Sequence, residues 1–314
     1  MRLGHIGLAA SVVCAMAGVG RCEAPDMRKP LDEAAANITY LSFDQALPQY
    51  QAVAKLVPEG SAQWQEAIFG EAVCQHQIMP ASAYSIGEAK RLFSLLVIKC
   101  PDSRFTPRAM MNLGRIAELT DYQGDVSDRE AARTWYEKAA QAAQGTPMEA
   151  EATLRIAATY VQTYQKEQVL QGIALLRDYV EKHPKDVMAS AMWQYMGESY
   201  FYPLADYRNS LDCYKTADLL GLVESGREGK VYWRMAVMAD RYLQDRDTAI
   251  AYYRKIIIKT PTSGKAYESQ LALKRLGVEP PRIELFDMMG GGGQPASTSS
   301  PSSTAPSTRQ EVAK

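Results

Sequence analysis

Cys74 and His76 come closer than any other residues of this sequence to a metal-binding pair, as a C-x-H motif in a segment with helical patterning. Helical residues two positions apart point about 200° away from each other. A structural zinc site also needs four ligands, and no second pair lies nearby in the sequence. We therefore expect neither a metal site nor a cofactor. His183, directly before Pro184, is expected at a helix end, where a cation complements the helix dipole.

Other catalytic signatures are missing from the sequence. The run Gly290–Gly293 is not followed by a Lys-Ser/Thr pair or by a helical pattern, so it does not predict a phosphate-binding loop. The chain contains no G-x-S-x-G, H-E-x-x-H or Walker-type sequence. Lys and Arg total 35 against 36 Asp and Glu, with no long basic run, which argues against nucleic acid as a partner. The sequence predicts a protein that is not an enzyme.

Aromatic and arginine side chains remain as candidates for binding a partner, because both are enriched at interaction hot spots. In register with Trp193, the candidates that lie off the expected core stripe are Arg115, Gln194, Glu198, Phe201, Tyr202, Trp233, Arg234 and Arg241. For Phe201, Tyr202 and Trp233 the alternative is packing against an adjacent helix, which we favour. These residues can form one surface only if helices place them on a common face.

A repeated pattern of large and small residues predicts those helices. WQYMGESY, residues 193–200, is followed by a second helical segment with small and large residues at spacings of four and three. That second-helix triplet occurs six times, 38 to 43 residues apart: Ala46/Tyr50/Val53, Ala89/Phe93/Leu96, Ala132/Tyr136/Ala139, Gly172/Leu176/Tyr179, Ser210/Tyr214/Ala217 and Ala249/Tyr253/Ile256. Such a period indicates a repeat architecture.

Packing explains why the pattern repeats. A small residue such as Gly197 lets two helices approach, and large neighbours such as Trp193 and Tyr200 fill the space beside it. A proline that follows the triplet by five residues should end the second helix, because it lacks an amide donor; this occurs at Pro58, Pro101, Pro184 and Pro261. Capping-box spacing predicts helix starts at Ser42 with Gln45, Ser85 with Glu88, Ser127 with Glu130, and Thr146 with Glu149, where Pro147 follows.

The sequence therefore predicts an all-α fold, and these residues resemble the tetratricopeptide repeat, W-x2-L-G-x2-Y, A-x3-F, P. Residues 193–200 match its first half, and residues 42–58 and 247–261 match its second half. Residues 109–140 are similar to the related Sel1-type repeat. The resemblance implies a right-handed α-solenoid of about five to six antiparallel helix pairs plus a capping helix near 263–276. It also implies a concave face that binds a protein or peptide.

The ends of the chain have different compositions. Residues 1–17 have a cationic start and an apolar run, typical of a signal peptide, and the run is too short to span a bilayer. We expect a lead-in at 18–41 whose structure the sequence does not determine, the repeat domain at 42–277, and a disordered Gly/Ser/Thr/Pro-rich tail at 278–314. Helix geometry separates Cys74 from Cys100 beyond disulfide reach, which predicts buried free thiols.

These features together favour a non-enzymatic scaffold of the bacterial periplasm or cell envelope, without a transmembrane helix once the signal is removed. The general pattern is similar to periplasmic proteins of outer-membrane assembly and cell-division coordination. One alternative is a polysaccharide-binding or accessory module of a cell-wall enzyme, with Tyr and Trp stacking on sugars. Another is a lipid-anchored outer-membrane component, modified at Cys22.

Overall fold

The computed structural model describes residues 26–223 and 228–282, and these residues form helices and no strand, so the predicted all-α class is confirmed. The helices are α1 (Arg28–Thr39), α2 (Phe43–Leu56), α3 (Ala62–Gln77), α4 (Ala83–Lys99), α5 (Thr106–Glu118), α6 (Arg129–Ala142), α7 (Pro147–Val161), α8 (Lys166–Lys182), α9 (Ala189–Phe201), α10 (Tyr207–Leu220), α11 (Glu228–Val237), a π-helical turn (Met238–Tyr242), α12 (Arg246–Lys259) and α13 (Gly264–Arg275).

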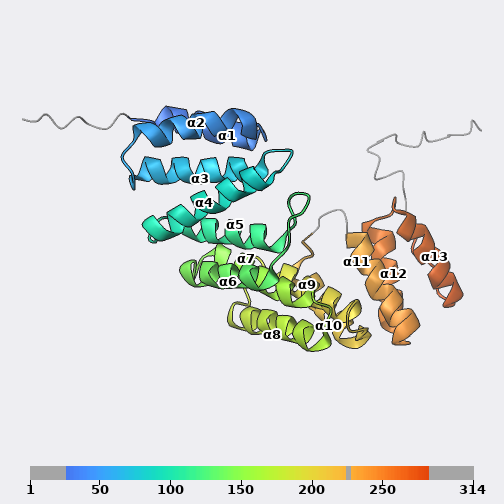
Figure 1. The fold of residues 1–314 in the computed structure, drawn as a ribbon. Coiled ribbons are helices and arrows are strands. Elements are labelled where there is room, and N and C mark those ends of the chain that lie inside the picture. The colour runs from blue at the N-terminus through green and yellow to red at the C-terminus, as the bar shows by residue number, and fades with distance from the viewer. Residues whose placement is uncertain (1–25, 224–227, 283–314) are drawn as a thin grey trace, which may run out of the picture. The chain divides into compact units, whose positions relative to one another are not determined.

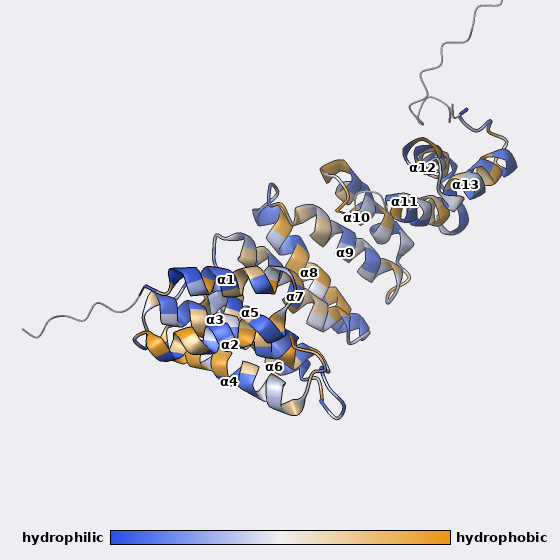
Figure 2. Ribbon diagram, turned by 90° about the horizontal axis from the view of Figure 1, so that it is seen from above, coloured by the Kyte–Doolittle hydropathy of each residue, from blue (hydrophilic) through white to orange (hydrophobic). Residues whose placement is uncertain are grey.

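The chain divides into two compact units, the first ending at Val223 and the second beginning at Glu224. In the first unit every helix from α1 to α10 packs against the next one in the sequence, as Figure 1 shows. In the second unit α12 packs against both α11 and α13. Figure 2 shows hydrophobic and hydrophilic residues on the same individual helices, as expected of helices that bury one side. The fold is an α-solenoid of consecutive helix pairs.

The six predicted second-helix triplets form the core. They lie on α2, α4, α6, α8, α10 and α12, and every one of their eighteen residues is buried. Tyr136, Tyr214, Tyr253 and Phe93 are among the largest fully buried side chains of the described residues. The repeat inferred from spacing alone is therefore the packing repeat of the molecule.

Three first-helix glycines lie against buried tyrosine rings. A Cβ atom added to Gly197 would lie 3.0 Å from the Tyr214 ring, and one added to Gly114 would lie 2.5 Å from the Tyr136 ring. Gly70 is equally close to the ring of Tyr50, 2.4 Å away. Trp193, which we also expected in the core, is only half-buried at the edge of this packing.

Prolines and glycines end the second helices. α2, α4, α8 and α12 each end two residues before the predicted proline. α6 and α10 have no such proline, and Gly145 (φ +77°) and Gly221 (φ +94°) lie just beyond them with left-handed backbone. Glycine adopts this conformation without the steric cost that a Cβ atom brings. Proline and glycine thus end the second helices at about the same position of the repeat.

The predicted helix starts need correction. The N-cap of α4 is Ser82, three residues before the predicted Ser85, and Ser85 completes its capping box. α6 is capped by Asp128 rather than Ser127, since its carboxylate accepts two amide hydrogens. Ser42 and Thr146 are N-caps at the expected positions, but neither side chain accepts a capping hydrogen bond. Pro147 does start α7.

A left-handed residue precedes the N-cap in four of the turns that lead into second helices. These residues are Leu41, Tyr164, Ala205 and Gln244, with φ between 51° and 59°. None is glycine, so the fold holds each of them against an intrinsic preference of about 1–2 kcal/mol. The sequence pattern had shown no sign of this repeated turn.

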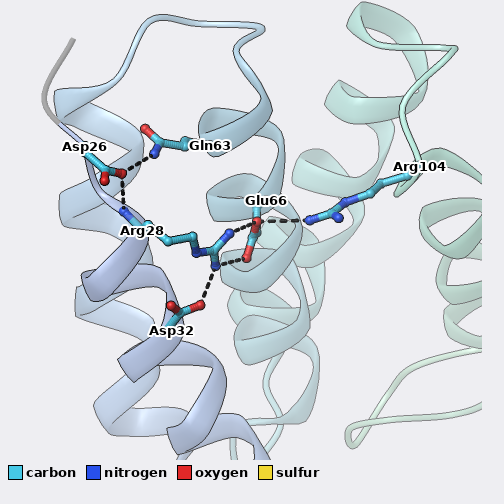
Figure 3. Close-up of polar contacts among 6 residues, drawn as sticks. All are labelled: Asp26, Arg28, Asp32, Gln63, Glu66 and Arg104. Atoms are coloured by element: carbon cyan, nitrogen blue, oxygen red, sulfur yellow. Dashed lines mark hydrogen bonds and ion pairs between the residues drawn. The ribbon is translucent and has the colours of Figure 1, made fainter.

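Helix α1 lies in the segment whose structure the sequence left open, and its Leu31 and Ala34 are fully buried. A polar network holds its start, as Figure 3 shows: Arg28 donates two hydrogen bonds to the Glu66 carboxylate of α3, of 2.9 and 2.6 Å. Arg104, just before α5, donates a further bond of 3.1 Å to Glu66. Glu66 therefore links α1, α3 and the turn that leads into α5.

Cys74, Cys100 and Cys213 are buried free thiols, as predicted. Burial raises the pKa of Cys74 to about 12, so the thiol stays protonated at neutral pH. Within residues 26–223 and 228–282, no helix is both long and apolar enough to cross a bilayer. The predicted signal peptide, Cys22 and Gly290–Gly293 lie outside the described residues.

Candidate binding groove

Four hollows follow one another over the first helices α5, α7 and α9. The first, of about 760 Å³, lies between the start of α5 and the α6–α7 turn. The second, of about 380 Å³, lies between α5 and α7 and shares Arg108, Pro147 and Met148 with the first. The third, of about 520 Å³, shares Pro147 and Glu151 with the second and reaches α9. The fourth, of about 270 Å³, shares Tyr195 with the third.

We call this continuous series of hollows the first-helix groove. Its position follows from the packing of the pairs. The first helices turn their small residues, such as Gly114 and Gly197, toward the tyrosines of the second helices. Residues on other sides of α5, α7 and α9 are then left to line the groove, among them Arg108, Asn112 and Arg115 of α5, Glu151, Leu154 and Arg155 of α7, and Tyr195, Glu198 and Tyr202 at α9.

The groove changes character along its length. At the α5 end the lining contains arginines, Arg104 and Arg108, together with Phe105 and Met148. The α9 end contains three tyrosines, Tyr164, Tyr195 and Tyr202, and the carboxylate of Glu198. Burial, followed by the charge of Glu198, raises the pKa of Tyr195 to about 12, so its hydroxyl stays protonated at neutral pH. A partner lying along the groove would meet cationic chemistry at one end and aromatic chemistry at the other.

A buried carboxylate lies behind the groove. Glu118 accepts a hydrogen bond of 2.7 Å from the Tyr136 hydroxyl and one of 3.0 Å from the Gln162 amide. Gln162 itself lines the tyrosine-rich hollow. Among the described residues, no lysine, arginine or histidine forms a salt bridge with Glu118 within 4 Å. Burial and then the hydrogen bond to Glu118 raise the pKa of Tyr136.

Four of the eight predicted binding residues lie on the groove's helices, and a fifth, Tyr202, is the C-cap of α9. Arg115, Glu198 and Tyr202 line hollows of the groove. Gln194 is on α9 but lines none of these hollows, and its buried Oε1 atom has no hydrogen-bond partner among the described residues. Phe201 packs against the rings of Tyr202 and Tyr207, with centroids 5.0 and 5.6 Å away.

The other three predicted residues belong to the second unit. Trp233 packs inside that unit: its ring centroid lies 5.6 Å from that of Tyr253, and the Lys265 ammonium is 4.5 Å from its centroid. This is the packing alternative that we favoured for Trp233. Arg234 is half-buried and Arg241 is exposed. The structure therefore does not gather all eight residues into one described surface.

The prediction missed every groove residue on α7, including Glu151, Leu154 and Arg155. Register with Trp193 could have found them, because Ala157 occupies the position of Gly197 and is fully buried. In this register Thr153 stands where α9 has Trp193, so α7 lacks the tryptophan that marks the repeat, although Tyr160 still matches Tyr200.

His76, the possible metal ligand of the sequence, lies elsewhere, at the end of α3. Its Nε2 atom is 3.7 Å from Asp121, and burial lowers its pKa although the Asp121 charge opposes that shift. Its Nδ1 atom has no hydrogen-bond partner among the described residues. Nowhere in the described ranges do three His, Cys, Asp or Glu side chains gather as they would around a metal ion.

No protein-family model matches this sequence, and no curated protein matches it. The likeness to tetratricopeptide repeats therefore stays an expectation from the quoted residues.

Proposed function

We propose that the protein is a non-enzymatic scaffold of the tetratricopeptide-repeat type, which binds an extended protein segment in the first-helix groove. The observation that carries this proposal is the continuity of the four hollows, since adjacent ones share lining residues from α5 through α7 to α9. The groove offers apolar, charged and aromatic side chains along one path. This mixture suits a peptide more than one small ligand, which would fill a single pocket.

Site-specific photo-cross-linking of the full chain in cells would test the groove. A cross-linking residue at Glu151, which two hollows share, should capture a discrete partner. The matched control is Gln171, which is also exposed but lies on second helix α8, outside these hollows. Charge reversal by Arg155→Glu should reduce capture at Glu151. Equal adducts from Glu151 and Gln171, or capture insensitive to Arg155→Glu, would contradict groove binding.

The cellular location belongs to the same proposal. We propose export to the periplasm or exterior of a bacterial cell, on the cationic and apolar pattern of residues 1–17. Intact-mass measurement of protein from fractionated cells would test it. A mature chain beginning at Gly18 supports export, one beginning at a lipid-modified Cys22 supports the anchored alternative, and one retaining residues 1–17 argues against both.

A further inference from the structure

The tyrosine-rich hollow is a small site inside the larger groove. Tyr164 and Tyr202 are 74% and 65% exposed, yet both line the same hollow as the half-buried Tyr195. The hollow measures about 270 Å³, slightly less than the range of about 300–1,000 Å³ for sites of drug-sized ligands. It is suited to one side chain of a longer partner.

The rings favour a positively charged occupant. The face of a tyrosine ring carries negative electrostatic potential and attracts ammonium or guanidinium groups by about 0.5–1 kcal/mol at exposed sites. Because the Tyr195 hydroxyl stays protonated, this ring acts as a neutral aromatic surface and not as a phenolate.

The surrounding charges favour the same occupant. Glu198 lines the hollow, and Glu118 lies behind it, bonded to the lining residue Gln162. Both carboxylates act on the Tyr195 hydroxyl, where the positive charge of Arg155 opposes them. Arg155 lines the neighbouring hollow and not this one. Among the residues that line the hollow, Glu198 is the only charged one, and it is acidic.

We infer that the hollow formed by Tyr164, Tyr195 and Tyr202 binds a basic side chain of the partner segment, with the cation over the rings and close to Glu198. This inference rests on the proposed function, because it identifies the partner chemistry at one end of the groove. It sets a direction for the partner: its basic residue lies at the α9 end, away from the arginines near α5.

A titration of the full chain, with isotope-labelled tyrosine rings observed by NMR, would test the inference. The probes are N-acetyl-lysine methylamide and N-acetyl-norleucine methylamide, which lacks the ammonium group, at constant ionic strength. The lysine probe should shift the ring signals of Tyr164, Tyr195 and Tyr202 saturably, and the norleucine probe should not. Tyr202→Ala should weaken binding about two- to fivefold, as the loss of one exposed cation–π contact, and Glu198→Gln should weaken it comparably.

The control variant is Tyr84→Ala, which removes another exposed tyrosine from α4, outside the hollow, and should leave binding unchanged. Equal shifts with both probes, no saturable shift, or stronger binding of chitotriose than of the lysine probe would overturn the inference. Chitotriose binding would favour polysaccharide instead. If the lysine probe does not bind but cross-linking at Glu151 stays selective, the inference about a basic side chain is wrong and groove binding stands. If both experiments fail, the proposed function is wrong.

Discussion

Two buried tyrosines donate their hydroxyl groups to carboxylates at equivalent points of the repeat. Tyr136 bonds Glu118 over 2.7 Å, and Tyr253 bonds Asp240 over 3.0 Å. Glu118 follows Gly114 by four residues, and Asp240 follows Ala236, the equivalent small residue, by four. The carboxylate therefore lies one helical turn after the small residue that packs against the tyrosine ring, where it can accept a hydrogen bond from the hydroxyl of that ring. A buried hydroxyl is thus satisfied without water.

Replacing Tyr136 with phenylalanine should destabilise the α5–α6 pair. The substitution keeps the ring but leaves the buried Glu118 carboxylate with one donor fewer, which costs about 1–3 kcal/mol. Amide hydrogen exchange in α5 and α6 would measure this loss as a lower free energy of local opening. Tyr84→Phe, at a residue 75% exposed, should change nothing. Unchanged protection in the Tyr136 variant would mean that the bond contributes no net stability.

Glu66 should make the docking of α1 depend on pH. The hydrogen bond from Arg28 is the largest cause that lowers the pKa of Glu66, and its burial opposes the shift. A carboxyl group with a lowered folded-state pKa contributes its full stability above its unfolded pKa of about 4.3. That contribution is lost as the pH falls through the folded pKa.

Glu66→Gln should therefore weaken α1 docking at pH 7 by about 1 kcal/mol, the upper range for an exposed ion pair, since Arg28 is partly exposed. At a pH below the folded pKa of Glu66, wild type and variant should be equally stable. Exchange of the buried Leu31 and Ala34 amides reports the docking. Glu33→Gln, on the exposed side of α1, is the control and should have little effect. A difference that persists at low pH would show that charge is not the cause.

At the scale of the helix, glycine has opposite roles at two positions that the sequence alone does not distinguish. Gly114 and Gly87 both lie inside helices, where glycine costs about 0.5–1 kcal/mol relative to alanine. A Cβ atom at Gly114 would lie 2.5 Å from the fully buried Tyr136 ring, whereas one at Gly87 would meet nothing within 4 Å. We expect Gly114→Ala to destabilise the α5–α6 pair by about 1–3 kcal/mol, as overpacking does.

Gly87→Ala should stabilise α4 by about 0.4–1 kcal/mol through the unfolded state. Thermal unfolding followed by circular dichroism would compare the two variants with wild type. If both substitutions stabilise the protein, Tyr136 moves aside easily and the close approach does not determine the spacing of the pair.

The same reasoning shows how far the sequence could predict the fold. The triplets were visible because only certain pairs of large and small residues let two helices approach, and that constraint recurs in every pair. The start of α4 was misplaced because Ser82 and Ser85 both suit a cap, and the choice between them depends on backbone geometry. The turns at Tyr164 and Ala205 left no signal, because tertiary packing holds ordinary residues in left-handed conformations there.

The groove was predictable only in part, for a related reason. Glu198 and Tyr202 were found because Trp193 and Gly197 set a clear register for α9. On α7 the equivalent positions hold small residues, so Arg155 could not be assigned to a face with the same certainty. The pattern records only the order of residues along the chain. It could not show that Arg241 belongs to a second compact unit.

At the scale of the first unit, stability should be local. Each helix from α1 to α10 packs mainly on its neighbours in the sequence, so few contacts join distant helices directly. In such a solenoid, stability is approximately a sum of terms for each repeat and for the interfaces between neighbours. The groove over α5, α7 and α9 could then respond to a partner while α1 and α2 remain unchanged.

A reciprocal pair of core substitutions would test this locality. Leu31 of α1 and Met192 of α9 are both fully buried, and truncation of either to alanine should cost about 2–5 kcal/mol where it occurs. We expect Leu31→Ala to accelerate amide exchange in α1 to α3 and to leave α8 to α10 protected as in wild type. Met192→Ala should do the reverse. The two variants are matched in burial and chemistry, so each controls for the other. If either substitution accelerates exchange uniformly from α1 to α10, the unit unfolds as one cooperative block, and a partner bound at α9 would then also stabilise α1.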